Sequence, residues 1–305
     1  MNQRKALLGL GILGLFGAVL FFSGCEEEDV GSIFGSESVR ATKVEARGME
    51  FEAPLSLEVE TTNGSVAVQG VAGIQTVSVT ITLWSRGQTL EAAQDRVNRI
   101  VYHTEQLGNR INLLYRPNEQ DDDVQRYSGV AFDVLVPMEA QVRVDTSNGE
   151  INIGRIQGTI ALDTSNGAIE VYDSTGVLTA NTSNGRIEVV RFSGDIHLGS
   201  SNGEMWLEQV SGLVDAETSN GSVRYTGNPT AAGNRIRTSN GSITVRVPLD
   251  ASIAFHAGTS SGKIHSSLPL LGDTQGDEWS AQLNPPAEVL FDLRTSNGTI
   301  RIEGL

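Results

Sequence analysis

The sequence predicts an all-β fold: a solenoid of 18-residue coils, with one amphipathic helix inserted near the N-terminal end. Three observations carry this prediction. The tetrapeptide Thr-Ser-Asn-Gly recurs along the chain, a short stretch of alternating apolar and polar residues follows each copy, and a second glycine precedes a second alternating stretch. A fixed period of this kind indicates one structural unit stacked on copies of itself.

The spacing of the tetrapeptides sets the length of the coil. Five successive asparagines, from Asn148 to Asn220, are 18 residues apart, and Gly298 follows Gly262 by 36 residues, or two periods. We attribute the Asn-Gly pair to a tight corner, because both residues tolerate positive φ. The residues expected to stack into a turn ladder are Asn148, Gly149, Asn166, Gly167, Asn184, Gly185, Asn202, Gly203, Asn220, Gly221, Asn240, Gly241, Asn297 and Gly298.

Each corner is flanked by two predicted strands. Ile169 and Val171 alternate with polar residues after one corner, and Ile160 and Leu162 do so after the second glycine of a coil, as half-buried strands do. An Asn-Gly pair between alternating strands is also a hairpin signal, which would give a β-sandwich. We favour stacked coils, because equivalent residues then lie about 4.8 Å apart and the same corner is needed in every coil.

Residues 1–24 have the pattern of a secretory signal peptide. Arg4 and Lys5 precede an uncharged apolar run over residues 6–22, and two small residues separate this run from Cys25. The run of 17 residues is also at the lower limit for a membrane-spanning helix. The segment Phe22-Ser23-Gly24-Cys25 resembles a bacterial lipobox. That resemblance implies lipidation of Cys25, removal of residues 1–24, and a membrane anchor formed by the acyl chains.

Residues 25–40 are expected to form an acidic flexible tether. Four acidic residues follow Cys25, and the rest of the segment is rich in glycine and serine. The resemblance implies a location in the cell envelope, and Glu26 favours the outer membrane if the cell is Gram-negative. The chain carries a formal net charge of −15. This charge argues against nucleic acid as a partner, because phosphate binding needs clustered Lys and Arg.

Residues 41–140 are expected to form an N-terminal β part that interrupts the repeat, and residues 141–305 are expected to form the solenoid itself. Strands are expected over 76–84, 111–115 and 130–136, with a polar loop over 118–126. A helix that includes His103 is expected over about 89–106, and it would cover one hydrophobic end of the solenoid. Its apolar face would consist of Leu90, Ala93, Val97, Ile100 and Leu107.

The motif Val-Pro-x-x-x-x-Val-x-Val over residues 136–144, followed by repeated Thr-Ser-Asn-Gly-x-Ile-x-Val units, resembles the DUF4097 family of adhesin-like proteins. The resemblance covers about residues 40–305. It implies a single-stranded right-handed β-helix in a cell-envelope setting, and it implies no reaction.

The sequence contains no catalytic, metal-binding or cofactor-binding motif that we can identify. We therefore expect a protein that is not an enzyme and has no cofactor. Stacking the predicted coils places Asp195, His197, Asp215 and Glu217 on one outward face, with His197 beside Asp215. This group is a hypothesis for a weak cation site, and a solvated acidic face is the simpler interpretation.

Trp206 is a second candidate, because Met205 and Leu207 should point inward and leave the indole outside. An exposed aromatic residue on a flat sheet is typical of ligand contact, although the N-terminal insertion or a loop could instead cover it. We expect a non-catalytic envelope lipoprotein, an adhesin or a scaffold or sensor, whose partner is an unknown envelope protein or glycan. The alternative is a carbohydrate-active β-helix enzyme, a polysaccharide lyase or hydrolase.

Overall fold

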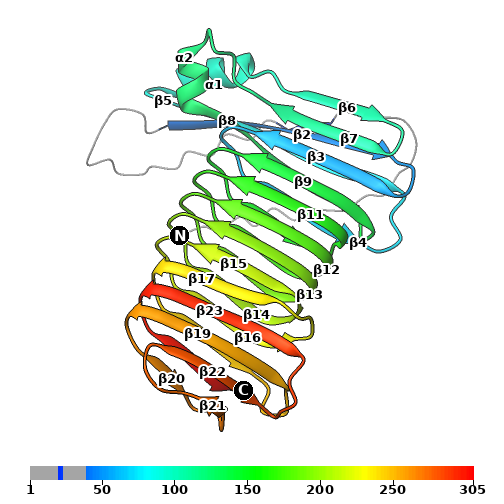
Figure 1. Cartoon of the computed structure of the whole chain (residues 1–305). Helices are drawn as coiled ribbons and strands as arrows, with labels where there is room; N and C mark the ends of the chain where they lie inside the picture. Colours follow the sequence, from blue (N-terminus) through cyan, green and yellow to red (C-terminus); the bar gives the residue numbers. More distant parts are fainter. Residues whose placement is uncertain (1–19, 23–38) are drawn as a thin grey trace, which may run out of the picture.

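The computed structural model describes residues 20–22 and 39–305, and these form an all-β rod with two short helices (Figure 1). Cys25 and residues 26–38 of the expected tether lie outside the described residues. Strand β1 (Leu20–Phe22) falls within the expected signal segment and pairs antiparallel with β2 (Val39–Glu50). Among the described residues, no helix is both long and apolar enough to cross a bilayer.

The strands form two layers that face each other across the core (Figure 1). From the N-terminal to the C-terminal end of the rod, the front layer consists of β6 (His103–Leu107), β7 (Arg110–Tyr115), β3 (Leu55–Thr61), β9 (Ala140–Thr146), β11 (Gln157–Thr164), β12 (Ile169–Thr182), β13 (Ile187–Ser200), β15 (Val214–Thr218), β17 (Asn234–Asn240), β23 (Val289–Asn297), β19 (Ile253–Ser261), β22 (Glu278–Leu283) and β21 (Leu271–Asp273). The back layer consists of β1, β2, β5 (Thr76–Gly87), β8 (Ser128–Pro137), β4 (Val66–Val71), β10 (Ile151–Gly154), β12, β13, β14 (Met205–Gly212), β16 (Val223–Pro229), β18 (Ile243–Val247), β24 (Ile300–Gly304) and β20 (Ile264–Ser266). Strands β12 and β13 run through a corner and belong to both layers.

In the central coils, each residue pairs in parallel with the residue 18 positions further along the chain. Ile169 lies opposite Ile187, and Leu178 lies opposite Ile196. These four side chains are fully buried, so the alternating apolar residues of both layers meet in one core. The all-β solenoid is therefore present, and the right-handed sense of its winding stays a prediction.

The Asn-Gly corners are tight for a reason other than the one we expected. None of their described asparagines or glycines has a left-handed φ. The glycines are needed because the coils approach closely: a Cβ atom on Gly185 would lie 1.7 Å from the carbonyl oxygen of Gly167. Left-handed backbone occurs at the second corner of the coil instead, for example at Asp173 (φ 52°) and Gly176 (φ 121°).

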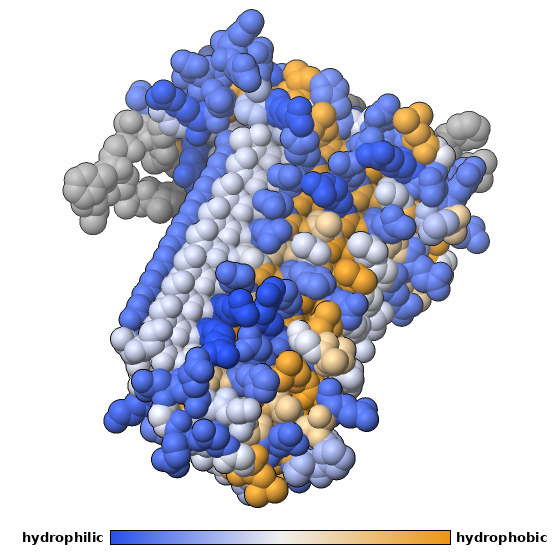
Figure 2. All heavy atoms as spheres, in the orientation of Figure 1, coloured by the Kyte–Doolittle hydropathy of each residue, from blue (hydrophilic) through white to orange (hydrophobic). Residues whose placement is uncertain are grey.

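The corner side chains form two sets of contacts between coils. The threonine of each corner is buried, and Thr182 Oγ1 donates a hydrogen bond to the carbonyl oxygen of Gly167 at 3.1 Å. The exposed asparagines form a continuous amide ladder along one edge of the rod, where Figure 2 shows straight rows of atoms. In this ladder each Nδ2 donates to the Oδ1 of the preceding asparagine at 2.8–2.9 Å, in the order Asn63, Asn148, Asn166, Asn184, Asn202, Asn220, Asn240 and Asn297.

The two terminal coils are inserted out of sequence order. The coil of β3 and β4 lies between that of β7 and β8 and that of β9 and β10. At the other end, β23 and β24 lie between β17 and β18 on one side and β19 and β20 on the other. Gly298 therefore stacks between Gly241 and Gly262, not two coils beyond Gly262 as its spacing suggested.

The helical insertion differs from the sequence prediction. Helix α1 (Leu90–Arg99) ends at Arg99, and the backbone of the next residue, Ile100, is extended. Residues 103–107 form β6, so the placement of His103 in a helix is wrong. Pairing with β7 satisfies the backbone hydrogen-bonding groups of this segment, and Thr104, its one β-branched residue, also favours a strand. A second helix, α2 (Asp122–Tyr127), lies in the expected loop, where the Asp121 side chain accepts a hydrogen bond from the amide of Val124. Helix α1 contacts β2 and β5 at the N-terminal end of the rod.

Candidate functional site

A shallow depression of about 530 Å³ lies on the outer surface of the front layer. It is centred on a column of outward residues in which Asn181, Gly199 and Glu217 lie opposite one another on successive strands. Gly199 carries no side chain, and the adjacent column contains the small Thr179. The hollow therefore arises where short side chains follow one another across a regular sheet, and its floor is rigid β-structure.

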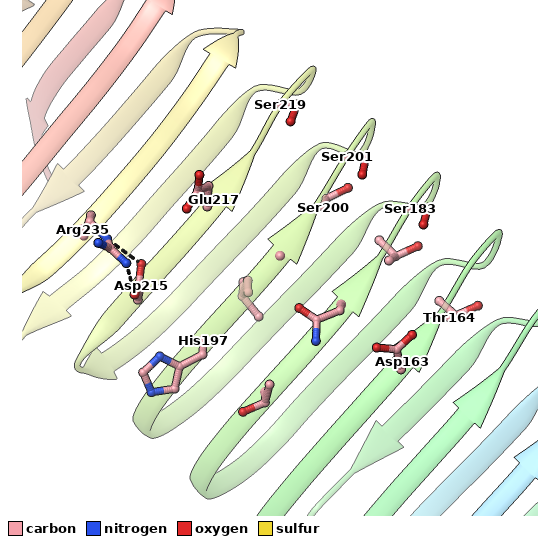
Figure 3. A pocket seen from close by; sticks show the side chains of 15 residues that line it. Asp163, Thr164, Ser183, His197, Ser200, Ser201, Asp215, Glu217, Ser219 and Arg235 are labelled. Atoms are coloured by element: carbon pink, nitrogen blue, oxygen red, sulfur yellow. Dashed lines mark hydrogen bonds and ion pairs between the residues drawn. The ribbon is translucent and has the colours of Figure 1, made fainter.

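The lining of the depression is polar. Figure 3 shows hydroxyl, carboxylate and imidazole groups that come from successive strands and from the corners between them. The polar lining residues are Asp163, Thr164, Thr179, Asn181, Thr182, Ser183, His197, Ser200, Ser201, Asp215, Glu217, Ser219 and Arg235. Such a surface offers many hydrogen-bond donors and acceptors and little apolar area, which suits a hydroxylated ligand.

The depression contains an ion pair that the sequence analysis did not anticipate. Nε and Nη2 of Arg235 donate to the two carboxylate oxygens of Asp215 at 2.9 and 2.5 Å (Figure 3). These hydrogen bonds raise the pKa of Arg235. The pair could have been found in the sequence, since the coil between Asn220 and Asn240 is 20 residues long and the same shift brings Asp215 opposite Arg235.

Asp163 lies at the N-terminal side of the depression. Partial burial raises the pKa of its carboxyl, and the neighbouring Asp145 raises it further. Arg143 and a hydrogen bond from Asn181 act in the opposite direction. The carboxylates around the depression are thus in different environments, because Asp215 is held by a guanidinium and Asp163 faces another carboxyl.

The structure brings together three of the four residues named for a weak cation site. His197 lies opposite Asp215, as the stacking predicts, and Glu217 is on the same strand as Asp215. Asp195 lies opposite Val177 and does not line the depression. Within residues 20–22 and 39–305, no three His, Cys, Asp or Glu side chains gather in a group that could hold a metal ion.

Trp206 lies on the other layer, so it cannot share a ligand site with His197. Its neighbours across the strands are Glu188 and Arg224, and the residue is half-buried. The guanidinium of Arg186 lies 4.6 Å from the ring centroid and that of Arg224 lies 5.2 Å from it. These cation–π contacts partly cover the indole, where we had considered cover by the N-terminal insertion.

Comparison with known families agrees with this architecture. Residues 57–303 match the sequence profile of Toastrack DUF4097. The chain belongs to the Toastrack DUF4097 family. This confirms the family resemblance that we drew from the Val-Pro motif and the repeats, and the matched range includes β23 and most of β3, the front strands of the first and last tetrapeptide coils. No curated protein matches the chain.

Several solved structures resemble this Toastrack chain distantly. One is described as a "putative adhesin" from Bacteroides fragilis, at 10% identity and a TM-score of 0.40, covering 86% of this chain and 97% of that one. Another is a "putative cell adhesion protein" from Clostridium sporogenes, at 10% identity and a TM-score of 0.27, covering 87% and 100%. A third is a "putative lipid binding protein" from Parabacteroides distasonis, at 14% identity and a TM-score of 0.31, covering 86% and 96%. These similarities are too weak to bear on function.

Proposed function

We propose that this protein is a non-catalytic lipoprotein of the cell envelope that binds an envelope glycan or protein on the rigid faces of its solenoid, as an adhesin or as a scaffold or sensor. The observation that carries the proposal is the polar depression on the front layer. Its hydroxyl, amide and carboxylate groups are fixed by parallel strands, so little conformational entropy is lost when a hydroxylated ligand binds.

The membrane anchor is the second part of this proposal. The lipobox resemblance implies acyl chains on Cys25, and β2 begins at Val39, so a short acidic segment would connect the lipid to the N-terminal end of the rod. Incorporation of labelled palmitate into the protein, lost in Cys25→Ser, would support the anchor. Equal labelling of Cys25→Ser, or a protein that stays soluble after cell fractionation, would contradict it. Location in an outer membrane, if the cell has one, rests on Glu26.

The alternative of a polysaccharide lyase or hydrolase receives less support from the geometry. Asp215 is engaged by Arg235 on both oxygens. Asp163 and Glu217 lie three strands apart, or about 14 Å at the spacing of a β-sheet. Carboxylate pairs that hydrolyse glycosides are about 5–9.5 Å apart.

A glycan array probed with the purified protein tests the function, with released products analysed in parallel. We expect binding without product release. Glu217→Gln should weaken binding several-fold because it removes a charged acceptor from the depression, whereas Glu208→Gln, an exposed carboxylate of the back layer, should not. Turnover that Asp215→Ala abolishes would overturn the non-catalytic assignment. If the two Gln variants weakened binding equally, the ligand would not bind in this depression.

A further inference from the structure

A basic cluster lies on the outer surface of the back layer, in its C-terminal third. Arg224, Thr244 and Arg301 lie opposite one another on β16, β18 and β24, and Thr226 and Arg246 occupy the next outward positions along two of these strands. These five residues, with Tyr225 and Glu303, line a depression of about 270 Å³. We call it the arginine depression.

The charge of the arginine depression is opposite to that of the chain. Three arginines and a single carboxylate line it, in a protein whose formal net charge is −15. Arg246 is paired with Glu303 at 2.9 Å. Among the residues that the structure describes, Arg224 and Arg301 make no ion pair although both are exposed. The local excess of positive charge is therefore carried by two guanidinium groups that are available to an external anion.

One of these two arginines is held in place. The Arg224 guanidinium lies 5.2 Å from the centroid of the Trp206 ring, which orders the side chain before any ligand arrives. Arg224 and Arg301 are separated by one strand, which corresponds to about 9.6 Å between their backbones. Their side chains can therefore converge above Thr244 on one anionic group or contact two successive groups.

We propose that the arginine depression binds an anionic saccharide through its carboxylate or phosphate groups. Guanidinium groups bind both of these oxyanions through paired hydrogen bonds. The hydroxyls of Thr226 and Thr244 lie beside the arginines and match the hydroxyls of a sugar. The exposed large apolar side chains Leu249 and Leu305 are absent from the lining of this depression, which favours a saccharide over a lipid surface. This site is on the opposite layer from the front depression, so its failure would leave the proposed function untouched.

Three polymers with one backbone test the proposal: carboxymethyl-dextran, dextran phosphate and neutral dextran, titrated into the purified full-length protein by isothermal calorimetry. We expect binding to at least one charged polymer and none to neutral dextran, with affinity falling as salt is raised. Arg224→Gln and Arg301→Gln should each weaken binding about tenfold, the effect of losing one charge-assisted hydrogen bond. Arg143→Gln, which removes the same charge from the exposed front layer, should change it less than twofold.

Comparison of the two charged polymers identifies which oxyanion is preferred. Vesicles of phosphatidylglycerol provide the lipid arm of the test. Binding to these vesicles without binding to either charged polymer would overturn the assignment to a saccharide. The proposal also fails if neither charged polymer binds at low salt, or if Arg143→Gln weakens binding as much as Arg224→Gln and Arg301→Gln do.

Discussion

At the scale of single residues, the corner glycines set the distance between coils. A Cβ atom on Gly167, Gly185 or Gly203 would lie 1.7 Å from the carbonyl oxygen of the glycine one coil earlier. That atom belongs to the backbone of a neighbouring coil, so a side chain could be accommodated only if two coils moved apart. Glycine recurs at this position because it lacks a side chain, and its backbone freedom is not used there.

Gly185→Ala tests this explanation. We expect the substitution to lower the free energy of unfolding by about 3 kcal/mol, because it overpacks a contact between two backbones. Gly48→Ala is a matched control, since the added Cβ would meet only the methyl group of Thr76 at 3.3 Å. Urea denaturation followed by circular dichroism measures both. A loss for Gly185→Ala no larger than that for Gly48→Ala would contradict the explanation.

Two tyrosines carry their hydroxyl groups into the core. The hydroxyls of Tyr115 and Tyr225 are buried and have no hydrogen-bond partner. Burial raises the pKa of Tyr115 to about 12, and it raises the pKa of Tyr225 as well. Because an unfolded tyrosine titrates near about 10, the folded protein retains these protons in a range where the unfolded chain loses them.

The free energy of unfolding should therefore be independent of these tyrosines below about pH 10 and fall as the pH rises from about 10 to 12. Tyr115→Phe removes one of the titrating groups and should make this fall shallower. At neutral pH the same substitution should leave stability unchanged or raise it by about 1 kcal/mol, because it removes an unpaired buried hydroxyl. Urea titrations at several pH values measure both effects. An unchanged slope in Tyr115→Phe would show that Tyr115 does not contribute.

At the scale of elements, the asparagine ladder joins all coils of the rod from that of β3 and β4 to that of β23 and β24, and it leaves out the outermost coil at each end. Its amide groups are exposed, so each hydrogen bond competes with water and contributes modestly. The ladder is directional, because each Nδ2 donates to the preceding Oδ1. An asparagine in the middle therefore takes part in two hydrogen bonds between side chains.

Asn202→Ala should lower the free energy of unfolding by about 1–2 kcal/mol, because it breaks the hydrogen bonds with Asn184 and with Asn220. Asn228→Ala serves as the control, since Asn228 is exposed and lies outside the ladder. Its effect should be below about 0.5 kcal/mol. Chemical denaturation of both variants provides the comparison. If the two variants lose the same stability, the ladder does not stabilise the stacking.

The central coils could be predicted from the sequence because their information is local. Ile169 and Val171 alternate with polar residues, which indicates the buried side of a strand. The 18-residue spacing alone brings His197 opposite Asp215. The end of α1 is harder to predict from the sequence. The helical spacing of apolar residues continues through Ile100, whereas residues 103–107 form a strand because they pair with β7. The arginine depression was missed because Arg301 reaches Thr244 only through an out-of-order coil.

At the scale of the whole molecule, the chain closes both ends of its rod in the same way. The first and last tetrapeptide coils lie one position inside the ends, and excursions of the chain form the outermost coils. Antiparallel strands then complete the front layer, β6 at one end and β22 with β21 at the other. In the front layer, the repeating parallel strands therefore do not present their own edge to solvent, which limits association through strand edges. The back layer ends at the C-terminal end of the rod in the parallel strand β20, which is only three residues long.

The central claim is that the corners of all coils stack in one column, with the last coil inserted between two earlier ones. Disulfide cross-linking tests it in a Cys25→Ser background. Ser296 is exposed and lies between Ser239 and Ser260 in the register of the strands. Neighbouring positions are about 4.8 Å apart, within the range of a disulfide, and positions two strands apart are not. Cysteine pairs at 239 and 296, and at 260 and 296, should cross-link under mild oxidation, whereas a pair at 239 and 260 should not. Efficient cross-linking of the pair at 239 and 260, without the other two, would contradict this arrangement of the coils.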